Sequence, residues 1–270
     1  MARQLARRGA IVLCPDNLGQ GERVAMGHHD VVGPFAAGLS FQGLIVMETL
    51  AWLRWARALP RVDAGRCAAI GNSGGGLLTL MLIPLAPELT AMCSTGYPST
   101  FNFIARKEKK HCHCNILPGV CRHLEMHHVY GCFAPRPLLL AQGLEDHLFS
   151  VDLFRLNARH VRRSYEAMNA GEQFEELVSP GRHSWDDDRR AAICQFLKTH
   201  LGLQSATDPP TETLLDPADT CYDTWPADAL DVDGLTAQLT GQTITRNLTL
   251  SDVYPAPDYE GRALADVTPR

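Results

Sequence analysis

The sequence predicts an α/β fold in which helices cover both faces of a mostly parallel β-sheet. Short apolar runs of strand length alternate with longer segments of helical periodicity through residue 200. Gly, Pro and Asp residues bound many of these segments, as they bound buried strands and helix ends. Such alternation favours a parallel sheet, because a crossover between parallel strands is usually a helix.

The elements follow from local signals in chain order. Residues 2–8 are predicted to form the end of a helix, which has basic residues in its last turn and stops at Gly9. The apolar run over 10–14, closed by Pro15, predicts a buried strand. On the helix predicted over 43–59, Trp52 and Trp55 have apolar neighbours and are expected in the core. The later elements are a strand over 67–70, a helix over 74–83, strands over 90–94 and 137–141, a helix over 151–169, a strand over 174–178 and a helix over 186–200.

Composition sets the expected organisation and excludes several classes. Of 270 residues, 45% are hydrophobic and 20% charged, which excludes a collagen, a coiled coil or a wholly disordered chain. We expect one α/β domain over 1–202, with an insertion over 96–133 that is rich in Cys and His. An acidic, Pro-rich tail over 203–270 follows it, in which Thr243–Leu250 is a candidate strand.

The sequence also narrows the partners and the compartment. No basic stripe stands out, so nucleic acid is not an expected partner. The apolar stretches are too short to cross a bilayer, so we expect no membrane partner. Nine scattered cysteines, several of them inside apolar runs, favour a reducing compartment and predict a cytoplasmic protein.

The strongest motif is Gly71-Asn72-Ser73-Gly74-Gly75-Gly76, which follows a predicted strand and opens a predicted helix. This is the G-x-S-x-G pattern of a nucleophile elbow, whose glycines relieve crowding at a sharp turn and leave the serine exposed. The pattern predicts Ser73 as the nucleophile and the backbone N–H of Gly74 as an oxyanion donor. The alternative is a Gly-rich turn that only packs a helix closely on a strand.

A nucleophilic serine needs a base, and the base needs an acid that orients it. Asp146 follows the predicted strand over 137–141, with Glu145 as the alternative acid, and His183 follows the next strand. This order of serine, acid and histidine predicts that His183 is the base and that Asp146 holds its tautomer. His147 is not expected to be the base, because acid and base should come from separate loops.

Several motifs together resemble α/β-hydrolases of the acetyl xylan esterase and dienelactone-hydrolase-like group. They are the elbow, the strand Ala134-Pro-Arg-Pro-Leu-Leu-Leu140 with its Gly-x-x-Asp turn, the segment Gly181-Arg-His-Ser-Trp185, and the run from Arg8 to Arg23. The resemblance covers roughly residues 1–200. It implies the α/β-hydrolase fold, a serine carboxylesterase acting on a small-molecule ester, acetyl esters as the favoured substrates, and no metal or organic cofactor.

The resemblance also implies an N-terminally truncated hydrolase. In the superfamily, earlier strands and the loop that gives the second oxyanion donor precede the helix that ends here at Gly9. The alternatives are another acyl hydrolase on the same fold, such as a peptidase or lactone hydrolase, and an inactive remnant.

A metal-binding module around residues 111–132 is a further alternative. The run His111-Cys-His-Cys114 is followed by Cys121, His123, His127, His128 and Cys132, and soft thiolates with imidazoles at this density suit zinc. The C-x-C spacing departs from the usual C-x₂-C, so a structural role is favoured. His28 and His29 are expected at the surface, with a place in the lining of the pocket as the alternative.

Overall fold

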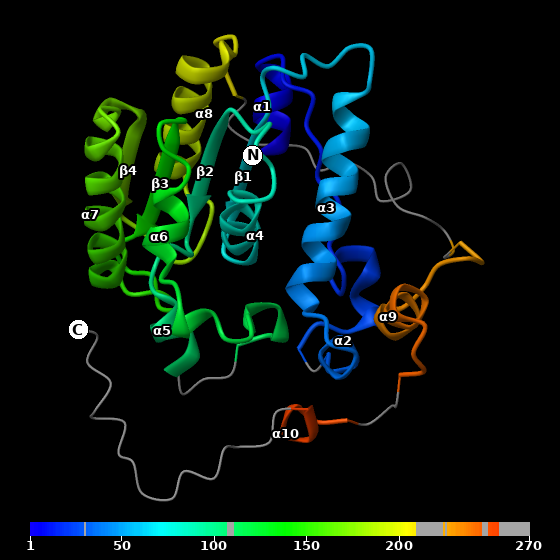
Figure 1. Ribbon diagram of the computed structural model, residues 1–270. Helices are drawn as coiled ribbons and strands as arrows, with labels where there is room; N and C mark the ends of the chain where they lie inside the picture. The colour runs from blue at the N-terminus through cyan, green and yellow to red at the C-terminus, as the bar shows by residue number, and fades with distance from the viewer. Residues whose placement is uncertain (30, 107–110, 209–223, 225, 245–247, 254–270) are drawn as a thin grey trace, which may run out of the picture.

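The computed structural model describes residues 1–29, 31–106, 111–208, 224, 226–244 and 248–253. Its centre is a four-stranded sheet in the order β1 (Ala68–Asn72), β2 (Ala91–Thr95), β3 (Leu138–Gly143) and β4 (Phe174–Ser179). Every neighbouring pair is parallel, so the predicted fold class is confirmed (Figure 1). Asn72 pairs with Thr95, and Gly143 pairs with Ser179, so the carboxyl ends of all four strands meet at one edge.

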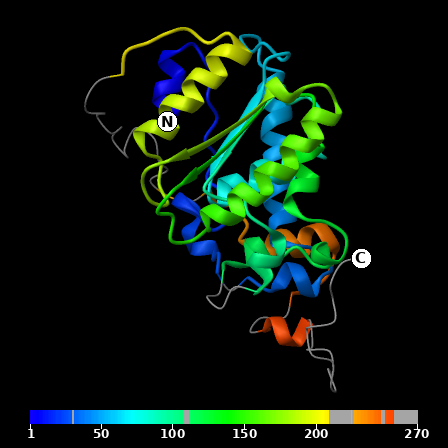
Figure 2. The same ribbon diagram turned by 90° about the vertical axis from the view of Figure 1, so that its left-hand side faces the viewer.

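Helices cover both faces of this sheet (Figure 2). One face packs against α4 (Gly74–Leu82), α6 (Met126–Gly131) and α7 (Val151–Ala167), and the other packs against α1 (Ala2–Arg7) and α8 (Asp187–Leu201). Successive residues of β2 serve opposite faces: Met92 lies in the first core, and Ala91 and Cys93 lie in the second. β3 is buried along its whole length, as expected of a strand covered on both faces.

A third group of buried residues lies beside the sheet. Leu18, Phe41, Cys114 and Val232 pack together there, and they bring parts of the chain that are far apart in sequence into one cluster. The elements around it are η1 (Gly21–Met26), α2 (Gly33–Ala36), α3 (Phe41–Arg57), η2 (His113–Asn115) and α9 (Val232–Thr240). The remaining short elements are α5 (Phe101–Arg106), η3 (Val120–Arg122), η4 (Gly171–Gln173) and α10 (Leu250–Val253).

The predicted strand over Ala10–Cys14 is wrong. These residues form neither strand nor helix, and Ile11 is 58% exposed. Only Ala10 and Val12 are partly buried, where they pack against the core on the α8 side, and no strand among the described residues pairs with the run. A short apolar run signals burial, whereas a strand also requires hydrogen bonds from a neighbour.

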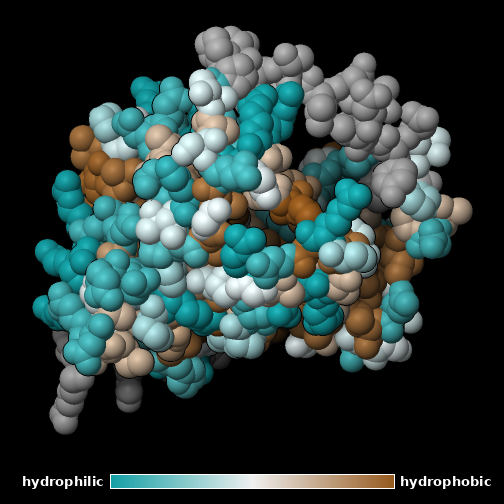
Figure 3. Space-filling view, turned by 90° about the horizontal axis from the view of Figure 1, so that it is seen from above, coloured by the Kyte–Doolittle hydropathy of each residue, from teal (hydrophilic) through white to brown (hydrophobic). Residues whose placement is uncertain are grey.

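Two other expectations need correction. Trp52 and Trp55 are 45% and 53% exposed on α3, where their rings contact each other edge to face at a centroid distance of 5.7 Å. Figure 3 shows hydrophobic residues in separate patches among hydrophilic ones on the face that it views.

The candidate strand Thr243–Leu250 does not form in its described residues, because Leu250 begins α10 and residues 245–247 lie outside the description. None of the helices in the described part of the chain is both long and apolar enough to cross a membrane.

Candidate active site

Ser73 lies at the turn between β1 and α4. Its φ of 58° and ψ of −120° place it in a region that residues other than glycine rarely adopt. Hydrogen bonds hold this geometry on both sides, since the Ser73 N–H donates to the Thr95 carbonyl at 2.9 Å and the Leu77 N–H donates to the Ser73 carbonyl at 3.0 Å. The sequence around Ser73 therefore folds as the sharp strand-to-helix turn that the motif predicts.

The flanking glycines explain why the turn can be this tight. A Cβ on Gly71 would lie 2.1 Å from the Gly75 carbonyl oxygen, and a Cβ on Gly76 would lie 2.7 Å from the Tyr97 Cβ. Gly74 is the first residue of α4, where the backbone N–H has no carbonyl within the helix to bond. The helix N-terminus next to Ser73 thus favours negative charge.

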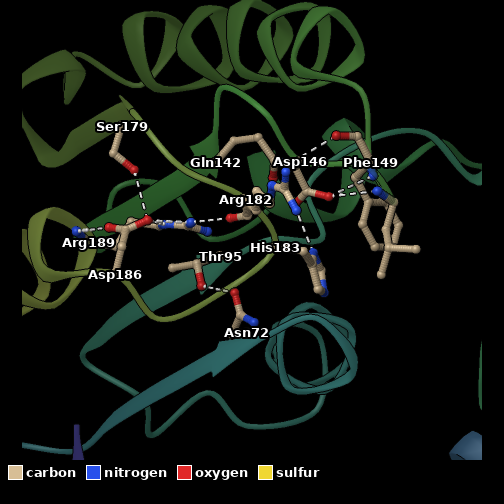
Figure 4. A network of polar contacts seen from close by, with 11 residues as sticks. Asn72, Thr95, Gln142, Asp146, Phe149, Ser179, Arg182, His183, Asp186 and Arg189 are labelled. Carbon is tan, nitrogen blue, oxygen red and sulfur yellow. Dashed lines mark hydrogen bonds and ion pairs between the residues drawn. The ribbon is translucent and has the colours of Figure 1, made fainter.

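Asp146 and His183 meet across the ends of β3 and β4 (Figure 4). His183 Nδ1 lies 2.7 Å from Asp146 Oδ2, and the Asp146 side chain is fully buried. The other carboxylate oxygen accepts the backbone N–H groups of Leu148 at 2.8 Å and Phe149 at 3.0 Å. The carboxylate is therefore held in one orientation toward the imidazole.

The electrostatics of this pair fix the histidine tautomer. Burial raises the pKa of Asp146, but the hydrogen bonds from His183 and the two backbone N–H groups lower it more, so the net shift is downward. A carboxylate can only accept, so His183 Nδ1 carries the proton and Nε2 is left as an acceptor. Among the described residues, this buried Nε2 has no hydrogen-bond partner.

The structure does not join Ser73 to the histidine by a hydrogen bond, but it brings the imidazole beside the residues that flank the elbow. A Cβ on Gly96 would lie 3.2 Å from His183 Cε1 and 2.5 Å from Asn72 Oδ1. Asn72 directly precedes Ser73, and its Oδ1 accepts a hydrogen bond from Thr95 Oγ1 at 2.8 Å. The imidazole thus lies above the ends of β1 and β2.

The other two candidates at the acid and base positions are placed differently. Glu145 is exposed, and its carboxylate accepts the backbone N–H of Gly181. His147 is also exposed, and its ring centroid lies 6.3 Å from that of His183. Asp146, and not Glu145, is the carboxylate that contacts His183.

Sequence reasoning missed the buried ion pair that supports the His183 loop. Arg189 on α8 is fully buried, and its Nε donates to Asp186 Oδ2 at 2.6 Å. Asp186 also accepts from Ser179 Oγ at 3.3 Å, and Arg189 Nη2 donates to the Arg182 carbonyl. These contacts join both ends of the loop to α8 (Figure 4). Asp186 at a predicted helix start was the available signal, since such residues cap helices.

One potential metal-ligand group occurs in the described part of the chain. It joins Cys112 and Cys114 of the predicted cluster with His28. His28 is half-buried and lines a cavity of about 760 Å³ that also involves Val232 of α9. The expectation of a surface position for His28 is therefore wrong, whereas His29 is exposed as expected.

No protein-family model matches this sequence, and no curated protein matches it either. Several solved structures share its architecture. A methylesterase is 22% identical with a TM-score of 0.54, over 70% of this chain and 41% of that protein. A CE15 glucuronoyl esterase from Caldicellulosiruptor kristjansonii is 17% identical with a TM-score of 0.52, over 68% and 57%. A Bacteroides fragilis protein assigned as an acetyl xylan esterase is 18% identical with a TM-score of 0.55, over 66% and 49%.

The chain spans between 41% and 57% of the length of these three proteins. All three are described as esterases, and at these identities the likeness concerns the fold. With the parallel sheet, the helices on both of its faces and the serine turn after β1, it shows that the chain has the α/β-hydrolase fold that the sequence motifs predicted.

Proposed function

We propose that this protein hydrolyses small carboxylic esters through an acyl-enzyme on Ser73. One arrangement carries the proposal. Ser73 has a strained backbone at the turn after β1, and at the same end of the sheet an ionised Asp146 contacts His183 Nδ1, which leaves Nε2 free to accept a proton. The esterase names of the structural neighbours support the same reaction class. Acetyl esters are the favoured substrates, because the sequence motifs resemble acetyl xylan esterases.

In the proposed chemistry His183 acts as a base and then as an acid in each half-reaction. His183 Nε2 takes the proton of the Ser73 hydroxyl while Ser73 Oγ attacks the acyl carbon. The Gly74 N–H stabilises the negative oxygen of the tetrahedral intermediate, and Asp146 stabilises the imidazolium. The imidazolium then protonates the leaving alcohol. Water attacks the acyl-enzyme by the same route, which releases the carboxylic acid and restores Ser73.

The test is covalent labelling of the full chain with a fluorophosphonate, read by intact mass and peptide mapping. We expect a single adduct on Ser73. Ser73→Ala and His183→Ala should abolish both labelling and the hydrolysis of p-nitrophenyl acetate, with unfolding transitions near that of the wild type. Ser184→Ala is the matched control, because Ser184 is exposed beside His183 and should leave both signals intact.

The outcomes separate the alternatives. No adduct in a chain that melts cooperatively would contradict the proposal and favour a non-catalytic protein. If labelling succeeds, a panel of acetyl, longer-chain acyl, lactone and peptide substrates distinguishes an esterase from another acyl hydrolase, since the fold and the triad do not fix the acyl group.

A further inference from the structure

Three potential metal ligands converge between η2 and the loop that follows η1. A ring nitrogen of His28 and the Sγ atoms of Cys112 and Cys114 lie within 4.8 Å of one another. His28 is far from the two cysteines in sequence, so the fold itself brings this group together. Cys114 is buried in the core cluster of Leu18, and the other two side chains are half-buried. The group is thus a built feature of the interior and not a chance meeting of flexible surface side chains.

The surroundings of His28 leave its Nε2, the ring nitrogen that faces Cys114, available to bind a metal. His28 Nδ1 lies 3.2 Å from the carbonyl oxygen of Leu18. A carbonyl can only accept, so Nδ1 carries the proton and the lone pair is on Nε2. That Nε2 lies 3.4 Å from Cys114 Sγ. A backbone carbonyl that orients a ligand imidazole in this way is typical of metal sites.

An amide is also directed at both sulfur atoms. Asn115 Nδ2 donates to Cys112 Sγ at 3.2 Å and to Cys114 Sγ at 3.4 Å. The amide orientation is fixed from its other end, because Asn115 Oδ1 accepts from the Tyr97 hydroxyl at 3.1 Å. Metals bind the thiolate form of cysteine, and the amide N–H group is placed to donate to both sulfur atoms.

We propose that the reduced Cys112–Cys114 pair and His28 bind one Zn²⁺ per chain, with water as the fourth ligand. Tetrahedral zinc with its usual bonds to sulfur and nitrogen separates neighbouring ligand atoms by roughly 3.5–3.8 Å. The separation of His28 Nε2 and Cys114 Sγ already lies close to that range. The Cα atoms of Cys112 and Cys114 are 5.4 Å apart, so one ion is within reach of both side chains.

Zinc and a disulfide are alternative states of this pair. The structure joins Cys112 and Cys114 as a disulfide, and a disulfide has no thiolate to offer. A thiol or phosphine reductant supplies two electrons, and with two protons it converts the disulfide to two thiols. Zinc binding then replaces the two S–H protons with two Zn–S bonds and releases both protons to solvent, while His28 binds through its existing lone pair.

The first test is a cobalt titration of the full chain, which has been reduced with a phosphine, freed of metal with a chelator and kept anaerobic. Co²⁺ bound to thiolate absorbs in the near ultraviolet through sulfur-to-metal charge transfer. We expect this absorbance to saturate at one Co²⁺ per chain and to disappear when Zn²⁺ displaces the cobalt. Cys112→Ser, Cys114→Ser and His28→Ala should each lose the signal. Cys121→Ser and His29→Ala are matched controls that should keep it.

A second measurement needs no variant. Zinc should protect Cys112 and Cys114 of the wild-type chain from alkylation at least tenfold and leave the rate at exposed Cys132 unchanged, as peptide mapping reports. A reduced, folded chain that shows neither the charge-transfer absorbance nor the protection would overturn the proposal. So would a signal that survives in both His28→Ala and Cys114→Ser. Neither readout depends on ester hydrolysis, so failure here leaves the proposed function untouched.

Discussion

Replacing each of the four glycines of the elbow by alanine tests which of them the turn requires. Gly71 and Gly75 occupy the two glycine positions of the G-x-S-x-G motif, yet their surroundings differ. A Cβ on Gly71 meets the backbone oxygen of Gly75 at 2.1 Å, whereas a Cβ on Gly75 or on Gly74 meets nothing within 4 Å. Gly76, which lies outside the five-residue motif, is crowded by Tyr97 and by the Thr95 carbonyl. The structure therefore predicts that Gly71 and Gly76 are required and that Gly74 and Gly75 are not.

The distances set the expected magnitudes. The Gly71 contact is about 1.3 Å short of an ordinary contact. The Cβ is attached directly to the backbone and its partner is a backbone oxygen, so neither can rotate away, and we expect Gly71→Ala to cost about 3 kcal/mol or more of unfolding free energy. Gly76→Ala has less severe contacts, and we expect it to cost about 1–3 kcal/mol. Gly74→Ala and Gly75→Ala should be neutral or stabilising by up to about 1 kcal/mol, because alanine forms helices better than glycine.

Urea unfolding measures these differences. The fluorescence of the four tryptophans and far-ultraviolet circular dichroism should give one coincident transition for each variant, and a shift in midpoint at constant slope gives the change in free energy. Gly75→Ala should also keep its ester hydrolysis. The reasoning fails if Gly75→Ala is destabilised as much as Gly71→Ala, or if Gly71→Ala unfolds at the wild-type midpoint.

Three more predictions concern Asp146 in the site, the arginines of α8 and His127 of α6. Asp146→Asn keeps an oxygen that can accept the N–H groups of Leu148 and Phe149, but it offers an NH₂ donor to His183 Nδ1 in place of an acceptor. We expect kcat/KM to fall about 10⁴-fold with little loss of stability. A folded variant that loses less than tenfold in kcat/KM would contradict this. Arg189→Met leaves Asp186 without its buried partner and should cost about 2–3 kcal/mol in urea unfolding, whereas Arg190→Met at a more exposed pair should cost less than about 1 kcal/mol; equal losses would refute the distinction. Burial, followed by the neighbouring His128 and His160, lowers the pKa of His127 to about 4. The folded state thus disfavours protonated His127. The contribution of neutral His127 to stability is complete above the unfolded pKa of about 6.5 and is lost as the pH falls toward 4. Allowing for solvent screening, the free energy of unfolding should differ between pH 7 and pH 4.5 by about 1–2 kcal/mol more in the wild type than in His127→Gln.

Local signals were enough to locate most of the sheet. β1 to β4 each begin and end within two residues of the predicted ranges. β1, β2 and β3 are mostly apolar segments with Gly, Pro or Asp nearby, whereas β4 is the apolar residues Phe174, Leu177 and Val178 around two glutamates. The start of α8 follows from Asp186, which caps the helix by accepting the Arg189 N–H. The elbow was equally visible, since a strand, a Gly-x-Ser-x-Gly run and a helix are all read from adjacent residues.

The features that sequence reasoning missed depend on contacts between distant residues. The residues near Ala10–Cys14 do not indicate whether a strand will pair with that run. Likewise, the residues near Trp52 do not indicate that its side chain stays exposed among the described residues. The approach of His28 to Cys114 requires two loops to converge, so the local Cys and His run suggested a cluster but could not supply its third member. Burial of Arg189 is likewise a property of the packed loop and not of its neighbours in sequence.

The unpaired nitrogen of His183 bears most directly on whether the site is catalytic. Leaving a buried acceptor without a donor costs about 1–3 kcal/mol. Here Asp146, which two backbone N–H groups hold in place, contacts Nδ1 of the imidazole, while Nε2 is buried and unpaired among the described residues. That cost is understandable if Nε2 is reserved for a donor that arrives during the reaction, first the Ser73 hydroxyl and then the attacking water. Nε2 of His113 is also buried and unpaired among the described residues, so the proposed acyl transfer is supported by the combination of this free nitrogen with the Asp146 contact and the serine turn after β1, and not by the nitrogen alone.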